Sequence, residues 1–349
     1  MHGFTRGFLS SVAPPLVSEA IFTGGIPQER AIGALWRRII AFLLDTLLVG
    51  IASILLTLPF FDTLSRLGPW GRLLGFCFAL PYFAILNSKI GNGQTLGKRW
   101  MRIQVIDASG RTLTFSRSAA RYVVLAIPYF LNGLILPVTR TPWAIASVIS
   151  LIVFGVGGAT LYLVLFNRRT RQGVHDLAVG SYVADASNTD TIEVQSIWKP
   201  HWVILSALLI ALLAGGGILG NKLTKWGPFP ELLEDARLVE TVDGVQSAAV
   251  QVLRSSNWGS GESKKTLVIS VRWTGNAASE TAFVDEIARL LMRQDPKVQD
   301  QDLLRIVLIR GYDLGIAHAQ TTHFFEHTPA AWNARLFGTP PTMAEPAKL

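Results

Sequence analysis

The chain has 349 residues, of which 50% are apolar and only 16% are charged, and its mean hydropathy is +0.36. Soluble proteins carry about 25% charged residues, so this composition excludes an ordinary soluble chain. The net charge of +8 comes from residues 1–222, which hold 19 Lys and Arg against 9 Asp and Glu, whereas residues 223–349 hold 13 against 15. Basic groups that flank apolar runs orient membrane proteins, so we expect a lipid bilayer and no nucleic acid as partner. The single cysteine, Cys77, excludes an intrachain disulfide.

Five apolar stretches predict membrane-spanning helices, because a bilayer core about 30 Å thick requires roughly 20 apolar residues of helix. The connections on one side of these stretches hold 15 Lys and Arg, and those on the other side hold three. Basic connections stay in the cytoplasm, so we expect the N-terminus inside and the C-terminal residues outside. The five stretches are Ile39–Phe61, Leu73–Ser88, Tyr122–Thr139, Thr141–Asn167 and Pro200–Asn221.

Two of these stretches are not uniformly apolar. The third contains Pro128, Asn132 and Gly133, which predict a kink or a broken helix. The last contains Gly216 and Gly220, whose spacing places two positions without side chains on one helix face. This face favours close helix packing or, alternatively, self-association into a homo-oligomer.

Asp45 is an acidic residue inside the first apolar stretch, seven residues after Arg38. At 1.5 Å per residue it lies about 10 Å deeper, and seven residues are nearly two turns, so both side chains share one helix face. A carboxylate at this depth costs several kcal/mol unless it is paired, protonated or hydrated. Two interpretations remain open: a charge pair that serves transport, or a structural pair with Arg38 or Arg121 that fixes the bundle.

The connection after the second stretch has a glycine-rich start that does not fit a phosphate-binding loop. A Walker loop requires glycine and Ser or Thr at the positions that Asn92 and Arg99 occupy. We expect residues 103–106 and 112–115 to form a hairpin that rests on anionic lipid, and Ser116 to cap the next helix. The run that opens this connection is Gly93-Gln94-Thr95-Leu96-Gly97-Lys98-Arg99.

A second polar motif follows the fourth stretch and places His175 next to Asp176. A carboxylate raises the pKa of an imidazole, which titrates near neutral pH, so this pair is a candidate for proton handling. A fastener that only holds the loop is the alternative interpretation. The motif reads Gln172-Gly173-Val174-His175-Asp176-Leu177-Ala178-Val179-Gly180.

Taken together, residues 31–185 resemble the RDD family of bacterial membrane proteins. The resemblance rests on three motifs in order: Trp36 to Asp45, Gly93 to Arg99 with its continuation to Asp107, and Gln172 to Gly180. The family is named after an Arg at the start of the first span, an Asp within it and a second Asp further on. These positions correspond to Arg38, with Arg37 as a competitor, then to Asp45, and to Asp176 or Asp107.

The resemblance implies a multi-pass protein of the bacterial inner membrane, with transport as the proposed role and exchange of monovalent cations for protons suggested for some members. Family members often end soon after the His-Asp motif. This chain continues with a fifth apolar stretch and with more than 120 further residues. A function that belongs to the shorter members therefore need not apply to the whole chain.

Residues 223–349 predict a small soluble domain. Alternation of apolar and polar residues over 245–253 and 267–273 predicts two strands, and residues 281–294 are predicted to form a helix. Two more strands are expected over 304–310 and 314–319. A final helix is predicted to begin at Pro329, with Thr328 as its cap. We therefore expect an α-helical membrane bundle of five transmembrane helices plus a small α+β domain with an antiparallel sheet. The whole chain is expected to have four parts: an N-terminal cytoplasmic segment (1–30), a four-span domain (31–185), a connector with the fifth helix (186–222) and an extracytoplasmic domain (223–349).

Three histidines of this domain have the chemistry of metal ligands. His318, His323 and His327 would supply three imidazoles to zinc, and the step from His323 to His327 would place two of them on one face of a helix. The residues around them resemble a strand end and a loop, so polar surface histidines are the alternative. We expect no cofactor and no enzyme, because no reactive constellation is visible.

Two functional hypotheses follow from the sequence. The first is a carrier in which Asp45, oriented by Arg38, handles a proton or a small cation. The second is a non-transporting scaffold, in which the charges fix the bundle and the C-terminal domain binds a protein partner outside the cytoplasm.

Overall fold

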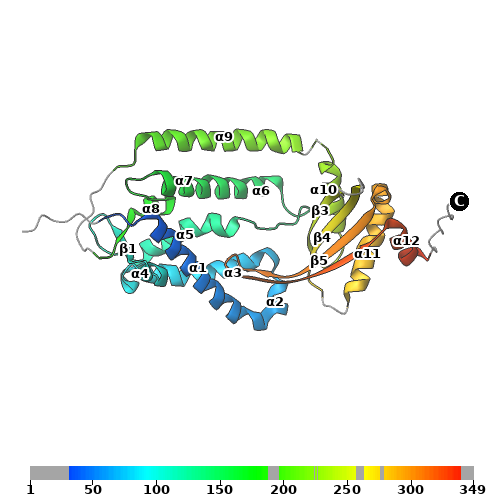
Figure 1. The fold of residues 1–349 in the computed structure, drawn as a ribbon, viewed down its shortest axis with the longest axis horizontal. Coiled ribbons are helices and arrows are strands. Elements are labelled where there is room, and N and C mark those ends of the chain that lie inside the picture. Colours follow the sequence, from blue (N-terminus) through cyan, green and yellow to red (C-terminus); the bar gives the residue numbers. More distant parts are fainter. Residues whose placement is uncertain are drawn as a thin grey trace, which may run out of the picture.

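The computed structural model describes residues 31–187, 196–223, 225, 227–256, 263–275 and 279–338 (Figure 1). These residues form an elongated molecule with a helical bundle in its middle. One end of the bundle carries the small sheet of β1 and β2, and we call it the loop end. The other end contacts the four-stranded C-terminal domain, and we call it the domain end.

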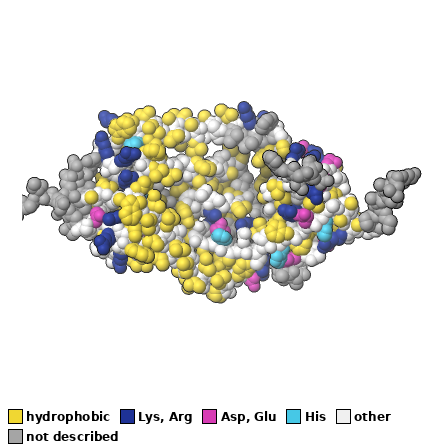
Figure 2. Space-filling model, in the orientation of Figure 1, with side chains coloured by type: hydrophobic (Ala, Val, Ile, Leu, Met, Phe, Trp, Pro, Cys, Tyr) yellow, Lys and Arg dark blue, Asp and Glu magenta, His cyan; other side chains and the backbone are white. Residues whose placement is uncertain are grey.

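The bundle contains four helical segments that are long and apolar enough to cross a membrane: Leu35–Ser65, Gly68–Leu86, Trp143–Phe166 and Lys199–Ile218. In each of the last two, only 6% of the most apolar window is buried, so their side chains require lipid around them. Apolar side chains accordingly cover much of the bundle in Figure 2. The helices are α1 (Leu35–Thr57), α2 (Phe61–Ser65), α3 (Gly71–Leu86), α5 (Phe115–Leu131), α6 (Trp143–Ser150), α7 (Gly158–Phe166) and α9 (Lys199–Leu223). A π-helical stretch, Leu151–Gly157, joins α6 and α7 into one rod.

The predicted count of five spanning helices is not confirmed, because the stretch Tyr122–Thr139 is helical only as far as Leu131. The helix ends next to Asn132 and to Gly133, which has a φ of +74°. The predicted break is thus present. The carbonyl groups of Phe130 and Asn132 accept hydrogen bonds from the Arg72 guanidinium, at 3.1 Å for Phe130. This contact satisfies backbone groups that the end of a helix leaves without intrahelical partners.

The loop end is built from elements on either side of α5. They are α4 (Leu96–Trp100), β1 (Ile103–Asp107), α8 (Val174–Val179) and β2 (Ser181–Asp185). The predicted hairpin of residues 103–106 with 112–115 is wrong, because β1 pairs antiparallel with β2 instead. The cap of α5 is also Thr114 rather than Ser116. Both differences arise because the partner of β1 lies about 75 residues further along the chain, where local pattern carries no information.

The C-terminal domain follows the predicted strand and helix order, preceded by one more helix. The predicted bounds of the last strand, 314–319, are wrong, because that strand begins at His318 and extends to His327. One hydrophobic core unites the helices with the sheet, and the fully buried Trp332 donates its indole N–H to the Leu304 carbonyl at 3.1 Å. The elements are α10 (Phe229–Val239), β3 (Val245–Ser256), β4 (Ser263–Trp273), α11 (Glu280–Gln294), β5 (Leu303–Asp313), β6 (His318–His327) and α12 (Pro329–Phe337).

The sheet of this domain is mixed and not antiparallel, contrary to the prediction. Its order is β3-β4-β5-β6, and β4 and β5 are parallel whereas the outer pairs are antiparallel. The helix α11 lies between β4 and β5 in the chain. Because that helix returns the chain to the start of the neighbouring strand, the two strands run in the same direction.

The turn between β5 and β6 enters the domain end of the bundle. Leu314 at its tip is fully buried, and Ile316 packs against α1 and α3 side chains. The turn can approach the helices closely because three glycines there have no side chain. A Cβ on Gly75 would lie 1.9 Å from the Leu314 carbonyl oxygen, and Gly71 and Gly50 face the backbone of Asp313 and Ile316 in the same way. We call residues 313–317 the inserted turn.

Polar contacts surround the inserted turn. Arg72 pairs with Asp313 at 2.7 Å, and Arg310 pairs with Asp62 at 2.6 Å. The Glu240 carboxylate accepts hydrogen bonds from the backbone N–H groups of Val138 and Thr139 at 2.8 and 2.7 Å. The C-terminal domain is therefore docked on the bundle of its own chain through both side-chain and backbone contacts.

Candidate functional site

The site begins with Asp45, which is fully buried in α1. Its carboxylate accepts hydrogen bonds from the Tyr82 hydroxyl at 2.7 Å, from the Gly97 backbone N–H at 2.8 Å and from the Thr95 hydroxyl. These donors come from α3 and from the start of α4. A buried carboxylate is thus satisfied by polar groups that two other elements bring to it.

The local sequence explains why the loop can reach Asp45. Gly93 has a φ of +65°, and a Cβ there would lie 2.4 Å from the Val105 carbonyl oxygen. Gly97 packs so closely that a Cβ would lie 2.3 Å from the Ala41 carbonyl oxygen of α1. The Gln94 side chain donates to the Ile103 carbonyl at 3.0 Å. Each of these motif residues therefore serves the close approach of the loop to α1.

Lys98 extends the hydrogen-bonded chain beyond Asp45. Its ammonium group donates to the Asn87 side-chain oxygen at 2.8 Å and to the Thr95 hydroxyl oxygen at 3.4 Å, and that hydroxyl donates to Asp45. Burial lowers the pKa of Lys98 to about 7, and the nearby charge of Arg121 acts in the same direction. We call Lys98, Thr95, Asp45 and Tyr82 the Asp45 chain.

A buried ion pair lies beside the Asp45 chain. The Arg121 guanidinium contacts Asp176 Oδ1 at 2.8 Å, and the Ser181 hydroxyl donates to the same carboxylate at 2.8 Å. Burial alone would raise the pKa of Asp176, but the charges of Arg121 and Arg38 outweigh it and hold that pKa well below its usual range. The pair joins α5 to α8, so it fixes the second motif against the bundle.

His175 also faces this ion pair. Its Nε2 lies 3.4 Å from Asp176 Oδ2, and burial lowers its pKa to about 4 despite the carboxylate. The imidazole is therefore neutral at pH 7. Among the residues that the structure describes, its Nδ1 has no hydrogen-bond partner. This geometry favours a fastener over a proton-handling pair.

Arg38 does not pair with Asp45, contrary to the expected charge pair. The structure shows no ion pair between these two described residues, and Arg38 donates instead to the Arg171 carbonyl. Its Nε and Nη2 atoms are buried without a partner within the described ranges. The competing Arg37 forms an ion pair with Asp185 at 2.8 Å. The partners of Asp45 are thus hydroxyl and amide groups and not the expected guanidinium.

The remaining motif residues divide between the buried site and the surface. Gln172 donates to the Ser181 carbonyl at 2.8 Å within the buried site. Asp107 instead closes a surface turn, where it accepts from the backbone N–H groups of Ser109 and Arg111. Arg99 is exposed and donates to the Gly91 carbonyl at 3.4 Å. Of the two carboxylates that competed for the second family position, Asp176 is the one that joins the buried charges.

The charges of this site do not balance. Arg38, Lys98 and Arg121 supply three cationic groups, whereas Asp45 and Asp176 supply two carboxylates, and His175 is neutral. Burial is the main reason that the pKa of Lys98 is lowered to about 7, and the positive charge of Arg121 acts in the same direction.

Sequence reasoning missed three residues of the site: Tyr82, Asn87 and the role of Thr95. Thr95 stands inside the first loop motif, and its position before α4 is typical of a helix cap, so that signal was present. Tyr82 and Asn87 lie in and just after α3, in an otherwise apolar stretch. Isolated polar residues next to a span end were the only signal for them.

Two other predicted sites have different outcomes. His318, His323 and His327 all lie on β6, where four residues span about 13 Å, and no group of metal-ligating residues exists within the described ranges. His323 instead contacts Glu280 at 2.5 Å. Gly216 lies on α9 with open space around it in this single chain, and Gly220 lies in the same helix. Their role in helix packing or self-association remains a prediction.

These features define a class of protein: a multi-pass membrane protein with apolar helices, whose loops at one end are fixed by buried charges. Residues 32–180 match the sequence profile of the RDD family, and they form an RDD family domain within this chain. The matched region contains α1 to α8 and hence the buried site except for Ser181 at the start of β2. The comparisons found no match among curated proteins and none among solved structures.

Proposed function

We propose that this protein moves protons, or exchanges a small cation for protons, across the membrane, and that the Asp45 chain accepts and releases the proton. The observation that supports this function is the position of Lys98. It is a largely buried amine whose pKa is about 7, and it is linked through one hydroxyl to a buried carboxylate. Both charge states of the amine are accessible near neutral pH, as a proton carrier requires.

The positive charge near Lys98 favours release of its proton. When Lys98 loses its proton, the repulsion with Arg121 is relieved, and Asp45 keeps its three hydrogen-bond donors. When Lys98 is protonated, Asp45 provides the compensating charge. Asp45 therefore acts as the counter-ion, and Arg38 holds the neighbouring loop through the Arg171 carbonyl.

We propose further that the loop end faces the cytoplasm of a bacterial cell and that the C-terminal domain lies outside the inner membrane. The loops at this end carry most of the basic residues of the membrane region, which is the arrangement that insertion favours. A reporter that is active only outside the cytoplasm should work when fused after Leu349 and fail when fused after Arg111. The reverse pattern would overturn this orientation.

The decisive experiment uses purified protein in liposomes that contain a pH-sensitive dye and are exposed to a sodium or potassium gradient. Lys98→Arg should abolish proton flux while it preserves the positive charge, because a guanidinium does not release its proton in proteins. Asp45→Asn should abolish flux as well. Asp107→Asn is the matched control, since it removes a carboxylate of the surface turn, outside the buried site. It should retain flux.

Folding must be separated from transport in this experiment. Each variant is compared with the wild type by thermal unfolding and by size-exclusion chromatography in detergent. Lys98→Gln serves as a second variant in case arginine does not fit the site. If a folded Lys98 variant and a folded Asp45→Asn variant both transport protons at the wild-type rate, the proposal is wrong.

A non-transporting scaffold is the second candidate function. The three hydrogen bonds that the Asp45 carboxylate already accepts favour it. Three donors already occupy this carboxylate, which is typical of a group that fixes neighbouring elements in place. In that case the C-terminal domain would bind a protein partner outside the cytoplasm. The liposome experiment discriminates between the candidates, because a scaffold shows no proton flux with any cation gradient.

A further inference from the structure

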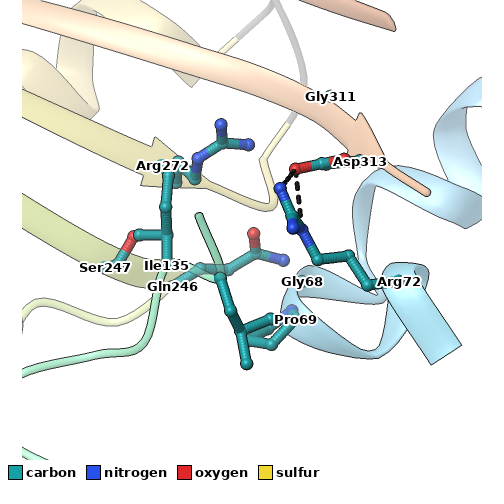
Figure 3. A pocket seen from close by; sticks show the side chains of 10 residues that line it. Gly68, Pro69, Arg72, Ile135, Gln246, Ser247, Arg272, Gly311 and Asp313 are labelled. Atoms are coloured by element: carbon teal, nitrogen blue, oxygen red, sulfur yellow. Dashed lines mark hydrogen bonds and ion pairs between the residues drawn. The ribbon is translucent and has the colours of Figure 1, made fainter. Parts of the chain in front are cut away.

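A pocket lies where the C-terminal domain meets the domain end of the bundle (Figure 3). Its volume is about 400 Å³, including the part that is open to solvent. Gly68, Pro69 and Arg72 form the wall on the bundle side. Arg272 and Asp313 belong to the wall on the domain side, so the pocket exists only when the two parts are docked.

The arginine on the bundle side is fully engaged. Arg72 donates to Asp313 from Nε at 3.0 Å and from Nη2 at 2.7 Å, and its Nη1 donates to the carbonyl groups of Phe130 and Asn132. The second oxygen of Asp313 accepts the Gly315 backbone N–H at 2.7 Å. Neither member of this ion pair is left to neutralise another charge at close range.

The arginine on the domain side has no such partner. Arg272 lies on β4 opposite Ser247 of β3, and its guanidinium projects from β4 on the side of the Arg72–Asp313 pair (Figure 3). With the residues that the structure describes, the guanidinium makes no hydrogen bond and no ion pair. Burial and the charge of Arg72 lower the pKa of Arg272, although Asp313 acts in the opposite direction.

The charge and the polar lining of the pocket suit an anion. Its lining contains two arginines and one carboxylate, so it has one excess positive charge. A β-bulge between Val245 and Ser247 turns Gln246 out of the strand register, and its amide donates to the Ser65 carbonyl at 3.0 Å. The Gln246 carboxamide thus lies in the pocket as an additional polar group (Figure 3).

The position of the pocket indicates which anion it meets. Gly68 and Pro69 belong to the short 3₁₀ turn at the start of the second candidate span, and Trp70 at the end of this turn is 70% exposed. An exposed tryptophan at a span end lies at the level of the lipid headgroups. Phosphate is the anion that is concentrated at this level, and the planar fork of an arginine matches its oxygens.

We propose that this pocket binds a phosphate group, with Arg272 as the cation that recognises it, and that the bound group bridges the C-terminal domain and the bundle. The phosphate belongs either to the headgroup of an anionic lipid or to a free phosphate ion. Because the pocket needs both walls, the ligand binds the docked arrangement and stabilises it. This site is independent of whether the Asp45 chain carries protons.

The test measures thermal unfolding of the full chain with two probes. The first probe is inorganic phosphate added to protein in a non-ionic detergent, with sodium chloride at matched ionic strength to account for screening. The second probe is a nanodisc of phosphatidylcholine with or without phosphatidylglycerol. Arg272→Gln removes the cation, Arg272→Lys retains the charge, and Arg254→Gln removes an exposed arginine of β3 as the matched control.

We expect at least one probe to raise the unfolding temperature of the wild type and of Arg254→Gln. We expect the apparent Kd for that probe to rise at least about tenfold in Arg272→Gln and less in Arg272→Lys, since a charge-assisted hydrogen bond is lost only in the former. A shift with phosphate identifies the free ion, and a shift only with phosphatidylglycerol identifies the headgroup. If neither probe shifts the wild type, or if Arg272→Gln responds like Arg254→Gln, the proposed site does not exist.

Discussion

The two ends of the bundle are held together by different physical means. At the loop end, charged and hydroxyl side chains are buried and satisfied by one another, with Arg121–Asp176 and the Asp45 chain as the main contacts. At the domain end, the backbone of the inserted turn lies against glycines of α1 and α3, and the ion pairs remain at its edge. The loop end therefore depends on charge and pH, whereas the domain end depends on shape.

The largest effect is expected from breaking the buried ion pair of the loop end. Arg121→Met should lower the free energy of unfolding by about 3–5 kcal/mol, because the Asp176 carboxylate then loses its compensating charge. Denaturant unfolding in detergent measures this change. Arg111→Met, at an arginine whose side chain is 81% exposed, is the control. Equal stability losses in the two variants would contradict the buried pair.

The pH dependence of the loop end is the next largest effect. His175 has a pKa of about 4 in the folded state and 6.5 in its ordinary state, so the unfolded chain binds its proton first. The contribution of His175 to stability is therefore fully present above pH 6.5 and should fall by about 3 kcal/mol as the pH decreases to 4. His175→Gln should flatten the curve of stability against pH in this window. An unchanged slope in that variant would show that another group causes the loss.

An effect of about 1–3 kcal/mol is expected from filling the glycine contact of the domain end. In Gly75→Ala the new methyl group would overlap the Leu314 carbonyl, so the inserted turn must move. Thermal unfolding should show the loss, and it should not depend on pH between 6 and 8. Gly158→Ala is the control, because that position has open space in the described structure. If alanine at position 75 were as well tolerated as at position 158, the close approach of the turn would be excluded.

The smallest effect concerns the polar contact of Tyr312 with Thr57, whose hydroxyl oxygens lie 2.8 Å apart in a buried position. Tyr312→Phe should destabilise the protein by about 1 kcal/mol, because Thr57 still donates to the Ser53 carbonyl. Tyr182→Phe, at a buried tyrosine of β2, provides a comparison at the loop end. A loss of several kcal/mol in Tyr312→Phe would mean that side-chain hydrogen bonds, and not the fit of the turn, hold the domain end together.

Local features of the membrane region were predictable from the sequence, whereas contacts between distant elements were not. The apolar stretches predicted the four candidate spans, and Pro128 with Gly133 predicted the break that shortens α5. The motif with Thr95 and Gly97 was evident in the sequence, but its contact with Asp45 was not predicted, and the expected Arg38–Asp45 pair is wrong. A helix-face argument places two residues on one side of α1 but does not say which neighbouring element lies opposite each of them.

In the C-terminal domain, the order of strands and helices followed from the pattern, but their pairing did not. The parallel arrangement of β4 and β5 depends on how α11 returns the chain across the sheet. The segment with His323 was expected to leave the strand, yet it continues β6 because it pairs with β5 along its full length. Pairing with β5 keeps this segment in a strand conformation, which its polar local sequence did not predict.

The sequence by itself determined the membrane class, the excess of basic groups near one end and the family motifs, because hydropathy, charge and short spacing are properties of local segments. The tertiary structure alone decided that Lys98 joins Asp45 through Thr95, that Arg121 neutralises Asp176, and that the turn of residues 313–317 enters the bundle. These contacts join residues that are far apart in the chain, and their energies depend on burial and close fit. Such properties exist only after the helices have packed.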